Sequence, residues 1–209
     1  MTNKDETIAR GVETALRCAE TKRWVDLSLA EIAEAAGLSL KDFHQIADKA
    51  DLAAAVDPFF DAAMSEASLD EDETARTRLF DVLMMRFEEM EARRDGTLSF
   101  LRWRDRTVPG LALRAKARLQ TARWALTCAG LDGGGGNLPR QAQLLGLAWA
   151  ISRAEKAWKS ETSADLSSTM AALDAELLKA ESRIDLLKQR GRWRKNAKAE
   201  TGEQNAEPV

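Results

Sequence analysis

The stretch from residue 28 to residue 46, SLAEIAEAAGLSLKDFHQI, constrains the fold of this chain more than any other. Two short helical patterns flank a Gly-Leu-Ser turn. Ser28 is placed to cap the first helix, with Glu31 three residues later as its reciprocal partner. Ser39 and Asp42 repeat this arrangement on the second helix. A glycine that ends one helix directly before the next cap forces a sharp reorientation, so the pattern predicts a helix-turn-helix.

The rest of the chain is typical of an all-α fold. Ala, Leu, Glu, Arg and Lys dominate, and long alternations of β-branched residues are absent. A first helix is expected over about residues 5–21, and a longer one from near Lys49, which Pro58 should bend or interrupt. The last two helices are expected over about residues 138–160 and 165–187.

The last predicted helix carries apolar residues at alternating steps of four and three, which is a heptad seam. The seam consists of Leu166, Met170, Leu173, Leu177, Ala180, Ile184 and Leu187. Such a seam needs a partner helix, either in the same chain or in a second copy. We favour the second copy, which predicts a homodimer through a four-helix bundle made of the last two helices of each protomer.

Composition argues against several classes of protein. No apolar run approaches the roughly 18 to 20 residues of a membrane span, so no stable membrane insertion is expected. Cys18 and Cys128 are isolated thiols, as expected of a reduced cytoplasmic protein. One histidine, no clustered carboxylates and no phosphate-binding glycine motif make an enzyme, a metal site or a cofactor unexpected.

Residues 8–56 carry a set of positions whose caps, turn and spacing agree over about fifty residues. They are Ala15, Leu16, Trp24, Ser28, Leu29, Ile32, Ala33, Ala36, Gly37, Leu38, Ser39, Phe43, Lys49, Ala50, Asp51 and Leu52. With these residues the chain resembles the TetR family of bacterial transcriptional regulators. The resemblance implies a TetR-like all-α fold and a homodimer that binds double-stranded DNA at a palindromic operator. It also implies a small ligand, here an unknown apolar one, that releases the DNA.

Three regions follow from the resemblance and from composition. Residues 1–50 would form a three-helix helix-turn-helix DNA-binding domain, and residues 51–188 a helical ligand-binding and dimerisation domain. Residues 189–209 turn basic and then poor in apolar side chains, which predicts a disordered basic tail.

A second resemblance involves the C-terminal half. Its segments are LFDVLMMRFE from residue 79, Trp124-Ala-Leu, Leu147-Ala-Trp-Ala and DLSSTMAALD from residue 165. They resemble TetR-type proteins related to the ubiquinone-biosynthesis accessory family, which has a TetR-like fold but binds lipid. This resemblance implies the alternative function of a lipid- or isoprenoid-binding accessory protein without DNA binding.

The candidate DNA-binding residues lie in or beside the helix-turn-helix. They are Ser28, Ser39, Lys41, His44, Gln45 and Lys49. Lys41 and Lys49 are expected to hold phosphates, while His44 and Gln45 would touch phosphate or base edges. A plain exposed helix position is the alternative for His44.

The N-terminal region also departs from a DNA-binding pattern. Leu40 stands where a basic residue is common, and it cannot bond to a phosphate. Residues 1–57 hold seven Lys and Arg against eleven Asp and Glu, a net charge of −4. Because cations supply most non-specific DNA affinity, this balance weakens the prediction of DNA binding.

Two further groups of residues have open interpretations. The first could line an apolar ligand pocket or be plain core: Phe80, Met84, Phe87, Phe100, Trp103, Trp124 and Trp149. The second is residues 102–123, with seven basic residues against Asp105 alone. It could be a solvated face or a surface for an anionic ligand or lipid.

Overall fold

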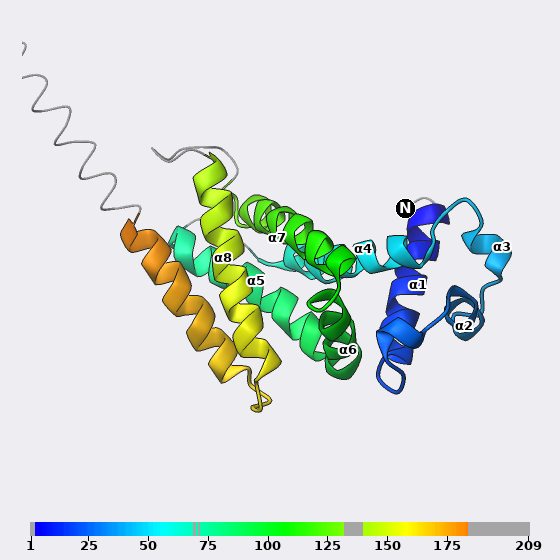
Figure 1. Cartoon of the computed structure of the whole chain (residues 1–209). Coiled ribbons are helices and arrows are strands. Elements are labelled where there is room, and N and C mark those ends of the chain that lie inside the picture. The colour runs from blue at the N-terminus through cyan, green and yellow to red at the C-terminus, as the bar shows by residue number, and fades with distance from the viewer. Residues whose placement is uncertain (1–2, 69, 71, 132–139, 184–209) are drawn as a thin grey trace, which may run out of the picture.

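The computed structural model describes residues 3–68, 70, 72–131 and 140–183, which are helical and contain no β-strand (Figure 1). The predicted all-α class is therefore confirmed. The α-helices are α1 (Asn3–Cys18), α2 (Leu29–Ala35), α3 (Leu40–Phe43), α4 (Lys49–Asp61), α5 (Ala75–Glu91), α6 (Arg94–Arg104), α7 (Val108–Cys128) and α8 (Arg140–Lys159). Two short 3-10 helices are η1 (Trp24–Asp26) and η2 (Ala62–Glu66). Residues 167–183 form a further helix, called the C-terminal helix below.

Helices α1–α3 form an N-terminal unit at one end of the molecule, and α4 leads from it into the body (Figure 1). The unit buries Leu16, Ile32 and Phe43 in a common core. Gly11 lets α1 approach its neighbours, because a Cβ at this position would lie 2.9 Å from Leu52 and 3.1 Å from Phe43. Apolar packing of this kind supplies most of the stability of short helices.

The sequence predicted that Pro58 would bend or interrupt this helix, and α4 is not interrupted. The helix continues through Pro58 to Asp61 and then tightens into η2. Proline removes one backbone donor, but Val56 and Phe60 are buried on either side of it and hold this turn against the body.

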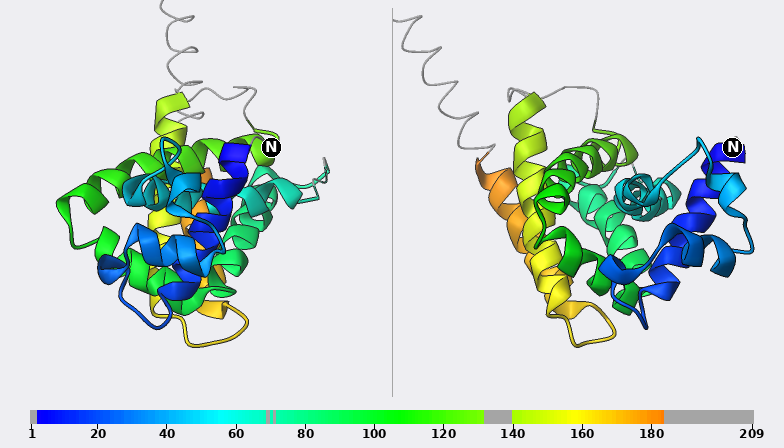
Figure 2. Two further views of the ribbon diagram at one scale, coloured as in Figure 1. Left: turned by 90° about the vertical axis from the view of Figure 1, so that its right-hand side faces the viewer. Right: turned by 45° about the vertical axis from the view of Figure 1, so that its right-hand side comes forward.

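Helices α5–α8 and the C-terminal helix form the body (Figure 2). Its core contains Leu83, Phe87, Phe100, Ile151 and Trp158, all of them fully buried. Helix α7 packs against both α8 and α4, so the body surrounds the second half of α4.

A second junction joins the N-terminal unit to α6. The Trp24 ring meets Phe100 edge-on with 4.8 Å between centroids, and its backbone N–H donates to Ser99 Oγ at 3.0 Å. At Gly96 a Cβ would stand 2.0 Å from the carbonyl oxygen of Leu16, so only glycine fits there. The unit is therefore attached to the body at two places, α4 and α6.

The heptad seam packs partly within the chain. Leu166, Leu173 and Leu177 are buried, whereas Met170 remains exposed. Ile184 and Leu187, like the predicted tail over residues 189–209, lie outside the described residues. The intrachain alternative thus accounts for part of the seam, and the homodimer stays a prediction. In the part of the chain that the structure describes, no helix is long and apolar enough to cross a membrane.

Candidate functional site

The turn between α2 and α3 has the predicted geometry. Gly37 adopts a φ of +64°, which favours glycine. Glu31 Oε2 accepts from the Ser28 backbone N–H and hydroxyl, both at 2.8 Å, and the Glu31 N–H donates back to Ser28 Oγ at 3.2 Å. Hydrogen bonds from Lys22 and then from Ser28 lower the pKa of Glu31 to about 2. The first predicted cap is thereby confirmed.

Helix α3 is a single turn. Asp42 accepts from the Ser39 backbone N–H at 2.7 Å and from its hydroxyl at 2.8 Å, and these bonds lower the pKa of the carboxyl. The second predicted cap is thereby confirmed, and the Asp42 carboxylate is engaged in local structure. His44 leaves the helix with extended backbone, and Gln45 has a φ of +62°. Of the candidate DNA-binding residues, Lys41 on α3 and His44 and Gln45 directly after it are exposed.

Lys49, which the sequence predicted to hold a phosphate, is engaged within the chain. Its Nζ donates to the carbonyl oxygens of Trp24 at 2.8 Å, Val25 at 3.2 Å and Leu27. Partial burial lowers its pKa, an effect that Asp26 partly offsets. A lysine with three carbonyl acceptors fixes the start of α4 against η1 and cannot also reach a phosphate without breaking those bonds.

Most other cations of the N-terminal unit are also engaged. Arg10 donates to the Ala36 carbonyl at 2.7 Å and Arg17 to that of Ala35 at 3.2 Å, so both hold the end of α2. Lys22 and Arg23 form ion pairs with carboxylates of the unit. Within the described residues, Lys4 and Lys41 are the cations of this unit that no ion pair or hydrogen bond engages.

The centre of the body is ionic, which the sequence did not reveal. Six charged side chains from α4, α5, α6, α7 and α8 are buried together there, and we call them the ionic centre. They are Asp57, Asp61, Arg86, Arg104, Arg118 and Glu155.

The two carboxylates of α4 occupy one side of the ionic centre. Arg86 reaches both, with Nη2 at 2.6 Å from Asp57 and Nε at 2.7 Å from Asp61. Thr121 donates its hydroxyl to the second oxygen of Asp61 at 2.8 Å. Helix α4 is therefore fastened to α5 and α7 through charge as well as through apolar packing.

Glu155 completes the ionic centre from α8. Arg104 Nη2 lies 2.7 Å from Glu155 and its Nη1 lies 3.3 Å from Asp57. Arg118 makes ion contacts with both acids, at 3.8 Å from Asp57 and closer to Glu155. Three arginines balance three carboxylates, which is how buried charges are tolerated.

The balance between burial and the charge of the arginines differs between the two carboxylates of α4. It favours the neutral form of Asp57, but Arg86, Arg104 and Arg118 outweigh it and hold the pKa of Asp57 below its ordinary value. Burial raises the pKa of Asp61 above its ordinary value, because Arg86 offsets only part of the penalty. Each carboxylate is occupied by arginine, so the ionic centre is suited to fixing helices rather than to acid–base chemistry.

The predicted pocket residues are not gathered around one cavity. Met84, Phe87 and Phe100 are buried in packed core, and Trp103 lies against Trp24 with 6.2 Å between centroids. Trp124 and Trp149 are exposed, and Trp124 donates its indole N–H to the Asp61 carbonyl at 3.0 Å. Of the seven, Phe80 lines an open groove.

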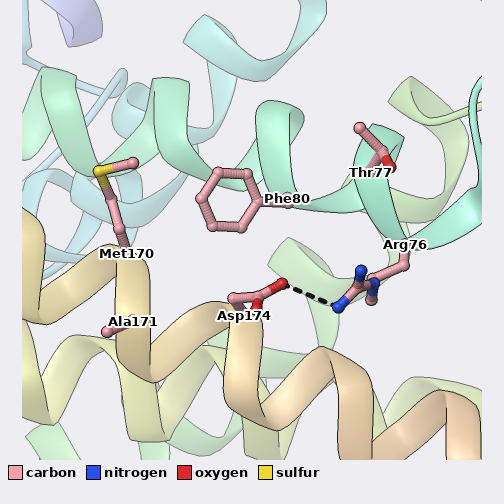
Figure 3. Close-up of a pocket in the computed structure, with 6 residues that line it drawn as sticks. All are labelled: Arg76, Thr77, Phe80, Met170, Ala171 and Asp174. Carbon is pink, nitrogen blue, oxygen red and sulfur yellow. Dashed lines mark hydrogen bonds and ion pairs between the residues drawn. The ribbon is translucent and has the colours of Figure 1, made fainter.

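This groove, of about 300 Å³, lies between α5 and the C-terminal helix (Figure 3). Phe80 and Met170 form its apolar part. At one end Arg76 crosses the groove to Asp174, with 3.1 Å between Nη1 and the carboxylate. Its volume is at the lower limit of small-molecule sites. Among the described residues, no group of three or more His, Cys, Asp or Glu side chains is placed to hold a metal ion.

Comparison with known proteins supports the fold. No protein-family model matches the chain, and no curated protein matches it in sequence. The crystal structure of a TetR transcriptional regulator from Rhodococcus sp. RHA1 matches with a TM-score of 0.56 and 19% sequence identity. The match covers 80% of this chain and 93% of the other. The predicted TetR-like fold is thereby confirmed.

Proposed function

We propose that this chain is a DNA-binding transcriptional regulator of the TetR type, acting in the cytoplasm as a ligand-responsive homodimer without enzymatic activity. One observation carries the proposal: a capped helix-turn-helix stands at the exposed end of a TetR-like fold (Figure 1). In such a motif the start of the second helix faces the base edges of a major groove.

Fewer residues are proposed to contact DNA than the sequence suggested. Lys41 would hold a phosphate, and His44 and Gln45 would touch phosphate or base edges, because all three are exposed. Ser28, Ser39 and Lys49 shape the motif through the bonds described above. The contribution of Lys49 to DNA binding would therefore be indirect.

The homodimer is supported by an exposed apolar stripe on α8. Leu145 is 62% exposed and Trp149, one turn later, is 60% exposed. A Cβ at Gly146 would meet nothing within 4 Å, so this part of α8 is open to another helix. Together with the exposed Leu178 of the C-terminal helix, this stripe would pair with its symmetry mate.

The proposed effector site is the groove between α5 and the C-terminal helix. Phe80 and Met170 offer apolar contact for a small ligand, and the Arg76–Asp174 ion pair borders it (Figure 3). A ligand there would press directly on α5, which carries Arg86 of the ionic centre. Displacement of α5 would reach α4 and so the N-terminal unit.

The alternative is a lipid- or isoprenoid-binding protein of the same fold that does not bind DNA. Two observations favour it: the net charge of −4 over residues 1–57 and the internal engagement of most cations in that region. A one-turn α3 also offers fewer side chains to a groove.

A mobility-shift assay on DNA upstream of the gene and on genomic fragments separates the two functions. We expect salt-sensitive retardation, and Lys41→Ala should weaken it roughly tenfold and lower the slope of log affinity against log salt by about one. Lys156→Ala, which removes the same charge from α8, is the control and should leave the slope unchanged. Absence of retardation at low salt, with lipid copurifying instead, would favour the alternative.

A further inference from the structure

The first half of α7 carries an apolar stripe that no described helix covers. Val108 is 82% exposed, Leu111 44% and Leu119 38%, and Ala112 and Ala115 between them are exposed as well. Steps of three and four residues place these five side chains, called the α7 stripe, on one face of the helix. The opposite face, with Ala117 and Thr121, is buried in the body.

Cations flank the α7 stripe and acids are missing from it. Residues 106–130 contain five Lys and Arg and no Asp or Glu, although the whole chain has a net charge of −3. Arg118 points into the ionic centre, whereas Lys116 and Arg123 are exposed beside the stripe. An exposed apolar face with flanking cations is typical of helices that lie in a membrane interface.

We propose that the α7 stripe binds the surface of membranes that contain anionic lipid. Val108, Leu111 and Leu119 would enter the boundary between headgroups and acyl chains, and Lys116 and Arg123 would contact anionic headgroups. The end of α7 that follows α6 projects to one side of α1–α3, so membrane contact would not be blocked by the N-terminal unit (Figure 2).

Charge argues for a membrane over the other partners. In a two-fold dimer the stripe would meet itself and bring the cations of both copies to one interface that holds no acid of α7, which costs free energy. DNA would attract the cations but offers no apolar layer to the stripe. An anionic bilayer satisfies both the apolar and the basic side chains.

Vesicle flotation of the full-length protein tests the proposal. One set of vesicles holds phosphatidylcholine alone, and the other holds phosphatidylcholine with an equal amount of phosphatidylglycerol. We expect the protein to float with the anionic vesicles at low salt and not with the neutral ones. Leu111→Glu with Leu119→Glu should abolish binding, and Lys116→Glu with Arg123→Glu should weaken it at least tenfold.

A matched variant controls for net charge. Lys4→Glu with Lys156→Glu changes the charge by the same amount at exposed positions away from α7 and should still float. The basic segment over residues 188–198 is present in every variant, so loss confined to the α7 variants assigns binding to the stripe. Val108→Trp adds a reporter at the most exposed position, and brominated lipid should quench its fluorescence more than that of the parent.

Three outcomes would overturn the proposal. They are equal flotation of the α7 variants and the parent, equal binding to both vesicle types, and quenching by brominated lipid that is no greater for the Val108→Trp variant than for the parent. None of these measurements involves DNA, so their result is independent of the proposed regulator function.

Discussion

The two ends of α4 are fastened by different chemistry. Its first half packs Leu52 against α1 of the N-terminal unit, and Lys49 binds neutral carbonyls of η1. Its second half presents Asp57 and Asp61 to buried arginines. Apolar surfaces allow several packings of similar free energy, whereas buried charges need their own partners at fixed distances. The position of α4 can therefore adjust more easily against the helix-turn-helix than against the body, where the ion pairs fix it.

The largest effect is expected at the charged end. Asp57→Asn leaves Arg86 and Arg104 buried beside a neutral group, and loss of one partner in a buried ion pair costs about 3–5 kcal/mol. The free energy of unfolding from urea titration measures this. Glu31→Gln, in the exposed pair with Lys22, is the comparison and should cost far less. Equal costs for the two variants would show that burial does not make the ion pairs of Asp57 more important for stability than an exposed pair.

A smaller effect is expected where the N-terminal unit meets α6. Gly96→Ala would place a Cβ against the Leu16 carbonyl, and overpacking of this kind costs about 1–3 kcal/mol. Because the clash lies between unit and body, the variant should increase hydrogen exchange of η1 amides more than that of α8. Gly146→Ala, with open space around it, serves as the control. Uniform exchange across both elements would show that this junction is not a separate boundary.

Lys49→Met tests the hydrogen bonds from Lys49 to the backbone carbonyls of η1 at the start of α4. Hydrogen bonds from a charged donor contribute about 1.5–3 kcal/mol, and partial exposure of Lys49 places the expected loss near the lower limit. If the proposed DNA binding holds, affinity should fall while the salt slope stays constant, in contrast to Lys41→Ala. A slope reduced by about one would instead assign Lys49 to a phosphate.

The smallest effect is expected for Asp61→Asn, about 1 kcal/mol at neutral pH. The raised pKa of Asp61 means that the folded state takes up its proton before the unfolded chain does, as pH falls. As pH rises from the ordinary pKa of Asp61 to its raised pKa in the folded state, ionisation of Asp61 therefore lowers the free energy of unfolding. Asp57, with a lowered pKa, does the reverse, and its contribution is lost as pH falls through the folded value.

Urea titrations from pH 3 to pH 7 separate these two contributions. Asp61→Asn should show a steeper rise of stability with pH than the parent, because only the opposing contribution has been removed. A shallower rise would mean that Asp61 is the better-paired carboxylate, and the order of the two positions within the ionic centre would be reversed.

Local signals in the sequence were sufficient for the caps and the turn. Ser28 and Glu31 are three residues apart, so their bonds depend on little beyond their own helix. Helix α3 ends at Phe43, which is buried in the core, because His44 turns to extended backbone and Gln45 adopts a φ of +62°. Neither residue carries a helix-stop signal such as glycine or proline, so the single turn of α3 was not predictable from its own residues.

The ionic centre could not be predicted from the sequence because its ion pairs join residues that are far apart in the chain. Arg104 and Arg118 belong to a basic segment whose pattern is typical of a surface, and their partners Asp57 and Glu155 come from other helices. Periodicity identified Phe87 and Phe100 as an inward face, but it does not tell whether that face encloses a cavity or packed side chains. Only the assembled helices decide between the two.

The ionic centre also sets the order in which the chain can mature during synthesis. Its members span residues 57–155, so Asp57 leaves the ribosome almost a hundred residues before Glu155. Helices α1–α3 close over local contacts and can fold early, whereas the carboxylates of α4 must stay hydrated until α5 through α8 have emerged. The nascent N-terminal unit would therefore be compact while its connection to the body remains open.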